Sequence, residues 1–95
     1  MLPIGSIIYL KEGSRKIMIL NRGPVIEENN ENIFFDYSGC SYPLGLNIDE
    51  IFYFNEENVD KILFEGFSDE DEERFDELYS EYLRENKNIR KGSVQ

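Results

Sequence analysis

The last third of the sequence holds one long helical pattern, and this pattern limits how the rest of the chain can fold. Five apolar side chains share one face of it: Phe75, Leu78, Tyr79, Tyr82 and Leu83. Their three- and four-residue spacing predicts a helix over about residues 69–87, with Ser68 as its N-cap and Asp71 completing a weak capping box. An amphipathic helix needs a second layer against its apolar stripe, so the preceding residues must supply that layer.

Short β-branched and aromatic runs precede the predicted helix, and each is typical of a strand. There are five such runs, at residues 7–10, 17–20, 33–37, 49–54 and 59–65. Residues 27–32 are expected to form a polar loop, residues 39–45 a structured loop, and Asn55 to cap a single helical turn through Asn58. Strands followed by one helix predict an α+β fold, with an antiparallel sheet of about five strands and one C-terminal amphipathic helix.

The length of 95 residues fits a single domain, which we expect over residues 1–88, followed by a short, flexible basic tail over residues 89–95. Seven Phe and six Tyr can fill its core without Trp. Cys40 is the single cysteine, whereas small secreted domains usually carry several. The sequence also lacks a signal-peptide pattern and a membrane-spanning apolar run. The expected location is therefore the cytoplasm.

Charge is distributed unevenly along the chain. Twenty acidic and ten basic side chains give a net charge of −10, and residues 49–85 alone hold fifteen acidic and three basic side chains. Because this segment repels nucleic-acid phosphates, binding to DNA or RNA is not expected. A basic protein partner, or one without charge, fits the composition better.

The residue inventory argues against catalysis. The chain has no histidine, so it lacks the commonest general base and metal ligand. Cys40 has no His to activate it, and we interpret it as a small buried hydrophobic residue. The acidic run at residues 69–73 lacks the alternating ligands and central Gly of an EF-hand loop. We therefore expect a protein-binding protein without enzymatic activity, bound metal or cofactor.

Two segments are candidates for the partner-binding surface. In the first, Tyr42 and Leu44 flank Pro43, and Gly45 follows Leu44. Pro restricts the backbone and Gly frees it, so this loop either plugs one end of the core or presents two rigid anchors to a partner.

The second candidate is the acidic start of the predicted helix. The helix dipole favours two or three acids there, but five consecutive carboxylates also repel one another. The excess serves either solubility or steering toward a basic partner, with Phe67, Glu70, Glu72 and Glu73 as candidate contacts. The aromatic stripe of the helix has two interpretations as well: it packs on its own sheet, or part of it docks into a partner's helices.

Three motifs, taken in order, resemble a family of small acidic proteins catalogued as a domain of unknown function. The motifs are Leu-Pro-Ile-Gly-Ser at residues 2–6, Tyr-Pro-Leu-Gly at residues 42–45, and Phe-Asn-Glu-Glu-Asn at residues 54–58 followed by Phe-Glu-Gly-Phe at residues 64–67. The resemblance covers about residues 2–85. The family's commoner second motif has an acidic residue in place of Leu44, a departure that would alter the choice of partner.

Members of the family that this chain resembles are encoded beside LXG toxin genes in Gram-positive type VIIb secretion clusters. The resemblance implies a cytoplasmic accessory, a chaperone or targeting factor, that binds the helical N-terminal region of an LXG effector. The alternative is an acidic immunity protein that binds the toxin's C-terminal domain and blocks its active site. Whether the chain forms a homo-oligomer stays open at this point.

Overall fold

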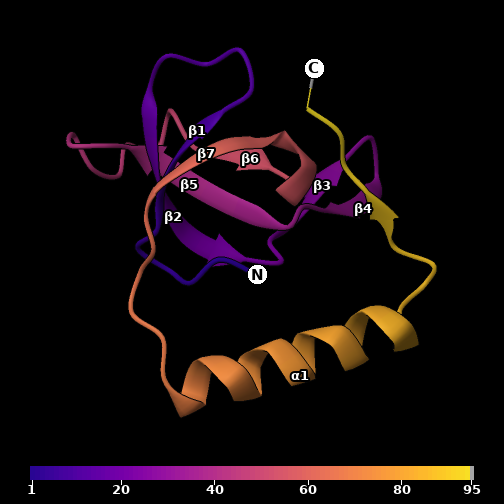
Figure 1. Ribbon diagram of the computed structural model, residues 1–95. Helices are drawn as coiled ribbons and strands as arrows, with labels where there is room; N and C mark the ends of the chain where they lie inside the picture. Colours follow the sequence, from indigo (N-terminus) through magenta and orange to yellow (C-terminus); the bar gives the residue numbers. More distant parts are fainter. Residues whose placement is uncertain (95) are drawn as a thin grey trace.

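The computed structural model describes residues 1–94, which form two sheets, one α-helix and one 3-10 turn (Figure 1). The elements in chain order are β1 (Ile7–Leu10), β2 (Lys16–Arg22), β3 (Val25–Glu28), β4 (Glu31–Phe34), β5 (Tyr37–Ser41), β6 (Phe52–Phe54), η1 (Glu56–Asn58), β7 (Val59–Phe64), α1 (Glu70–Glu85) and β8 (Arg90–Lys91). Asn55 begins the single helical turn η1, as predicted.

The larger sheet has the strand order β6-β5-β2-β1-β7, and all its neighbouring strands are antiparallel. This confirms the predicted α+β class, with a five-stranded antiparallel sheet and one helix after it. The predicted first hairpin is present, with Ile8 opposite Ile17.

The third strand of this sheet lies later in the sequence than predicted. The run at residues 33–37 is divided, because Ile33 and Phe34 belong to the second sheet and β5 begins at Tyr37. β5 then continues through residues that the sequence predicted as loop. The reason is steric: a Cβ atom on Gly39 would lie 2.7 Å from the Met18 carbonyl oxygen, so small residues are required where β5 passes β2.

The second sheet has the order β3-β4-β8 and corrects the prediction of a polar loop over residues 27–32. Residues Glu27 and Asn32 pair across the β3–β4 hairpin. Its turn consists of Asn29 and Asn30, with φ angles of 54° and 63°. Two-residue hairpin turns need this left-handed conformation, which Asn tolerates better than most residues.

Residues 90–92 differ from the free basic tail expected over residues 89–95. β8 pairs in parallel with β4, and the Gly92 N–H donates to the Phe34 carbonyl at 2.7 Å. Gly92 is buried, and a Cβ atom there would lie 2.3 Å from the Phe35 ring. The side-chain amide of Asn55 donates to the Gly92 carbonyl at 2.9 Å, so the returning chain is fixed to both sheets.

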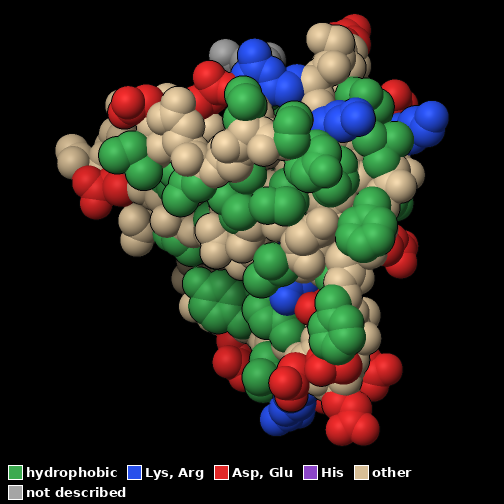
Figure 2. All heavy atoms as spheres, turned by 90° about the vertical axis from the view of Figure 1, so that its left-hand side faces the viewer, with side chains coloured by type: hydrophobic (Ala, Val, Ile, Leu, Met, Phe, Trp, Pro, Cys, Tyr) green, Lys and Arg blue, Asp and Glu red, His purple; other side chains and the backbone are tan. Residues whose placement is uncertain are grey.

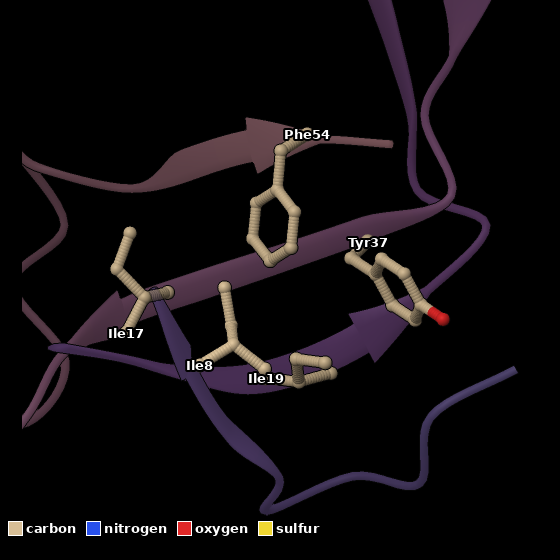
Figure 3. Packing of buried hydrophobic residues seen from close by; sticks show 5 residues of the cluster. All are labelled: Ile8, Ile17, Ile19, Tyr37 and Phe54. Atoms are coloured by element: carbon tan, nitrogen blue, oxygen red, sulfur yellow. The ribbon is translucent and has the colours of Figure 1, made fainter. Parts of the chain in front are cut away.

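The core lies inside the curled five-stranded sheet. Its buried cluster consists of Ile8, Ile17, Ile19, Tyr37 and Phe54, whose side chains point toward one another from β1, β2, β5 and β6 (Figure 3). Cys40 is also fully buried, as predicted for a small hydrophobic residue. No helix within residues 1–94 is long and apolar enough to cross a membrane.

The helix α1 lies along one side of the strands, joined to β7 by an extended linker (Figure 1). Its N-cap is Asp69 rather than Ser68, because the Asp69 carboxylate accepts hydrogen bonds from the N–H groups of Asp71 and Glu72 at 3.0 and 3.3 Å. None of the residues of α1 is buried. The helix therefore covers the strands far less completely than the sheet covers its own core.

Candidate partner-binding surface

The loop after β5 presents apolar side chains to solvent on a fixed backbone. Leu44 is 87 % exposed, Ile48 is 80 % exposed and Tyr42 is 43 % exposed. The Tyr42 N–H donates to a carbonyl of β2 at 2.9 Å, and the Gly45 N–H donates back to the end of β5 at 2.9 Å. Of the two arrangements that the sequence allowed for this loop, Leu44 therefore adopts the exposed one rather than plugging the core.

An ion pair fixes the far end of the same loop. Arg15, from the β1–β2 turn, pairs with Glu50, and its guanidinium lies 5.7 Å from the centre of the Phe52 ring. The hydroxyl of Ser41 donates to the same Glu50 carboxylate at 3.3 Å. A loop held at both ends loses little conformational entropy when a partner binds it.

The end of β7 and the linker from β7 to α1 add a second group of exposed apolar side chains. Phe67 is 81 % exposed and Phe64 is 59 % exposed. Gly66 holds the linker in place: its N–H donates to the Ser6 hydroxyl at 3.0 Å, and a Cβ atom there would lie 2.2 Å from the Ile4 carbonyl oxygen. Figure 2 shows hydrophobic side chains gathered over this face, with acidic side chains below them where the helix begins.

The acidic start of α1 divides into outward and inward carboxylates. Glu70 and Glu73 are exposed, as the steering hypothesis requires. Glu72 instead turns toward the strands, where its Oε2 lies 2.6 Å from Nη1 of Arg22. Both side chains of this pair are nearly buried, with 11 % of Glu72 and 6 % of Arg22 exposed. Glu72 is thus engaged within the chain, and Glu70 and Glu73 remain available to a partner.

Arg22 is a residue of this region that the sequence analysis did not single out. Its guanidinium lies 4.1 Å from the centre of the Phe75 ring, in addition to pairing with Glu72. The sequence feature that could have identified Arg22 is its position as a lone basic residue at the end of an apolar strand, directly before Gly23. We call Arg22, Glu72 and Phe75 together the latch, because they join β2 to α1.

Two polar atoms of α1 near the latch are buried without a hydrogen-bond partner among the described residues. They are Oδ1 of Asp76 and the hydroxyl of Tyr79. The Tyr79 ring lies against Gly23, where a Cβ atom would come within 2.5 Å of it. Burial, with the nearby charge of Asp36, raises the pKa of Tyr79 to about 12.

Tyr37, in the sheet, shows the opposite arrangement. Its hydroxyl accepts from the Leu2 N–H at 2.8 Å and donates to Glu56 at 2.6 Å. Burial and the Glu56 carboxylate raise the pKa of Tyr37 far above its usual value. The cavity beside it, of about 480 Å³, is lined by Met1, Leu2, Tyr37, Glu56, Val59, Asp60 and Ile62. Residues 1–94 contain no group of three His, Cys, Asp or Glu side chains placed to hold a metal ion.

A family model described as a domain of unknown function, DUF4176, matches residues 1–75. The chain belongs to the DUF4176 family. Neither a curated protein nor a solved structure matches it. The family match confirms the resemblance at the level of a domain of unknown function.

The part shared with the DUF4176 family contains both sides of the latch. Residues 1–75 include Arg22, Glu72 and Phe75, as well as the exposed loop and the linker. The remainder of α1 and β8 lie beyond the match. The family region therefore consists of strands β1 to β7, the exposed loop, the linker and the first turns of α1.

Proposed function

We propose that this DUF4176 protein is a cytoplasmic, non-enzymatic accessory that binds an LXG-type toxin for export by a type VIIb secretion system. It acts as a chaperone or targeting factor, one copy per helical N-terminal region of the toxin. The observations that carry the proposal are the exposed apolar side chains Leu44, Ile48 and Phe67, together with the outward acids of α1.

The chemistry of this surface favours an amphipathic, basic helical partner. Large apolar side chains on an ordered backbone are typical of binding anchors, and clusters of them on a surface mark interaction sites. A helix that places apolar residues against Leu44 and Phe67 would bring basic residues on its flank toward Glu70 and Glu73. A toxin region built of long helices exposes such surfaces before export and benefits from having them covered.

A second candidate function is neutralisation of a toxin's C-terminal domain. The observation in its favour is the outward acidic side of α1, where Glu70, Asp71 and Glu73 are all exposed. Such a surface suits a basic nuclease through charge complementarity. This role makes less use of the apolar loop, so we place it second.

The test measures binding of the two toxin halves separately by isothermal titration calorimetry. We expect the N-terminal helical half to bind and the C-terminal domain not to bind. The double variant Tyr42→Ala, Leu44→Ala should weaken binding by about tenfold or more, because both side chains act as anchors. Val25→Ala, which truncates a half-exposed apolar side chain on β3, is the matched control and should bind normally.

Three results would count against the proposal. Binding of the C-terminal domain alone would favour the immunity role. An unchanged affinity in the double variant would remove the loop from the interface. A large fall in the thermal midpoint of the double variant would show that these side chains support the fold instead, whereas truncating exposed residues usually changes stability by less than about 0.5 kcal/mol.

A further inference from the structure

The contact between α1 and the strands contains little buried apolar surface. No residue of α1 is fully buried, and two members of its apolar stripe remain partly in solvent: Leu78 is 46 % exposed and Tyr82 is 40 % exposed. Since the hydrophobic contribution scales with the apolar area removed from water, packing of the stripe holds the helix only weakly.

The latch supplies the most specific attachment of the helix. Arg22 reaches from β2 to the Glu72 carboxylate and lies over the Phe75 ring, and it also donates to the Leu2 carbonyl at 3.3 Å. A nearly buried ion pair holds only while both partners are present, because removing one leaves an uncompensated charge. Attachment through one ion pair can therefore be released by a single local change.

The same interface contains unsatisfied polar atoms, and one of them favours opening. Oδ1 of Asp76 and the hydroxyl of Tyr79 lack hydrogen-bond partners among the described residues, although Asp76 faces the Met1 ammonium at 4.0 Å. The Tyr79 hydroxyl regains hydrogen bonds with water when the helix moves away, whereas the Asp76 side chain is already 43 % exposed. The closed position is thus opposed by the burial of the Tyr79 hydroxyl.

Both ends of α1 are joined to well-anchored segments by irregular chain. Gly66 is bonded to Ser6 before the helix, and Gly92 is bonded to Phe34 after it. Residues 67–69 and 86–89 between these anchors belong to no strand and no helix. We propose that α1 is a strap, closed by the latch, that lifts off the strands as a unit while both ends stay attached, and that the toxin's helical region binds the open strap.

The binding step rests on the proposed function above, whereas the opening step does not. Opening frees Phe75 and Tyr79 to join Leu78 and Tyr82 in one continuous apolar stripe. Exposed acids, among them Glu70 and Glu81, border this stripe. The open strap therefore matches an amphipathic helix with basic flanks, the partner chemistry already assigned to the neighbouring face.

The opening step is tested by native-state amide hydrogen exchange in a urea series on the isolated protein. We expect the amides of α1 to exchange through an opening that depends weakly on urea, and those of β2 and β5 through one that depends steeply on it. Glu72→Gln should speed exchange in α1 by about tenfold or more and keep the weak dependence, because Arg22 loses its counter-charge. Glu77→Gln, which removes an acid from an exposed ion pair of the same helix, should change it by less than about twofold.

Two exchange results would overturn the strap. One is a single steep urea dependence shared by α1 and the sheet, which would make the protein one cooperative unit. The other is equal acceleration of α1 in Glu72→Gln and Glu77→Gln, which would show that the latch has no special role.

The binding step is tested by titrating the N-terminal toxin half into the same two variants. Each variant removes one negative charge, so only the latch distinguishes them. If the open strap binds, Glu72→Gln should tighten the apparent affinity by up to about tenfold, because the competent state is more populated, and Glu77→Gln should not. Weaker binding of Glu72→Gln than of Glu77→Gln would overturn this step. Absence of binding in the wild type would instead refute the proposed function, and the exchange result would still decide the opening.

Discussion

In the five-stranded sheet, Ile8, Ile19 and Phe54 are fully buried and pack against one another, whereas no residue of α1 is buried. The sheet is stabilised mainly by apolar contacts in a closed interior. The helix is joined to it through the nearly buried pair of Arg22 and Glu72, through the Phe75 ring over the guanidinium and through the Tyr79 ring against Gly23. The sheet cannot open without exposing its core. The contact between the helix and the sheet, in contrast, can open locally.

This difference suggests a division of roles within a chain of 95 residues. The closed core of the sheet is expected to supply most of the small net stability that a domain of this size has. The helix can then carry the strongly acidic, partly apolar surface without being needed to complete the fold. The predictions below test this division, beginning with the largest expected effect.

Truncating a core residue of the sheet should cost far more stability than truncating the helix stripe. Phe54→Ala should lower the free energy of unfolding by about 3–5 kcal/mol, because it leaves a cavity among fully buried side chains. Leu78→Ala, at a position on α1 that is 46 % exposed, should lower it by less than about 1 kcal/mol. Urea unfolding followed by circular dichroism measures both. Equal losses would show that the helix is part of the same core.

Removing the buried amide that joins the sheets should have the next largest effect. The Asn55 side chain accepts from the Asp36 N–H at 3.0 Å and donates to the Gly92 carbonyl at 2.9 Å. Asn55→Ala leaves both backbone groups buried and unpaired, which we expect to cost about 2–3 kcal/mol. The exposed Asn32→Ala is the matched control and should be nearly neutral in the same urea experiment. A neutral Asn55→Ala would mean that water replaces both hydrogen bonds.

The sequence predicted the fold class well because alternation and helical spacing report burial directly. It predicted the first hairpin, the turn after Asn55 and the position of α1. It placed β5 too early, because the small residues that close packing against β2 requires, such as Gly39, look like turn formers in a sequence. It also missed β8, a two-residue strand held by backbone hydrogen bonds, which depend little on side-chain pattern.

The candidate surface was only partly predictable for a similar reason. Local pattern identified Leu44 and Phe67, since both stand in turn-rich segments that the structure leaves exposed. The inward direction of Glu72 was not predictable from the acidic run, because it depends on Arg22, which lies fifty residues earlier in the chain. A contact across that separation in sequence requires the fold itself.

The two buried tyrosines should respond in opposite ways to loss of their hydroxyl groups. Tyr37→Phe leaves the Leu2 N–H and Glu56 without a partner, so it should cost about 1–2 kcal/mol at pH 8. Tyr79→Phe removes a hydroxyl that has no partner among the described residues, so it should be neutral or slightly stabilising. Thermal unfolding of both variants measures the contrast. Destabilisation by Tyr79→Phe would reveal a bound water at that hydroxyl and weaken the case for opening.

Tyr79→Phe should also change how the stability of the protein depends on pH in the alkaline range. The folded protein raises the pKa of Tyr79 from 10.0 to about 12, so folding favours the neutral phenol. This contribution is fully present below pH 10 and is lost as the pH rises from about 10 through about 12. The thermal midpoint of Tyr79→Phe should therefore fall less steeply over that range than that of the wild type. Parallel curves would show that the Tyr79 hydroxyl already contacts solvent.

The smallest expected effect is on the rate of association with the partner. Removing the outward acids of α1 should change this rate through the loss of their exposed charge, whereas the inward acid, Glu72, is paired within the chain. Glu70 and Glu73 are exposed, so their charges act on an approaching basic partner, whereas Glu72 is neutralised by Arg22. Steering by exposed charge slows association when the charge is removed and leaves dissociation unchanged.

The double variant Glu70→Gln, Glu73→Gln should thus slow association with the N-terminal toxin half by about threefold at low salt and flatten its salt dependence. Stopped-flow association at two salt concentrations measures this. An unchanged rate in the double variant would leave the acidic run as a solubilising start of the helix. The remaining attraction would then lie in the exposed apolar side chains Leu44, Ile48 and Phe67, which salt does not screen.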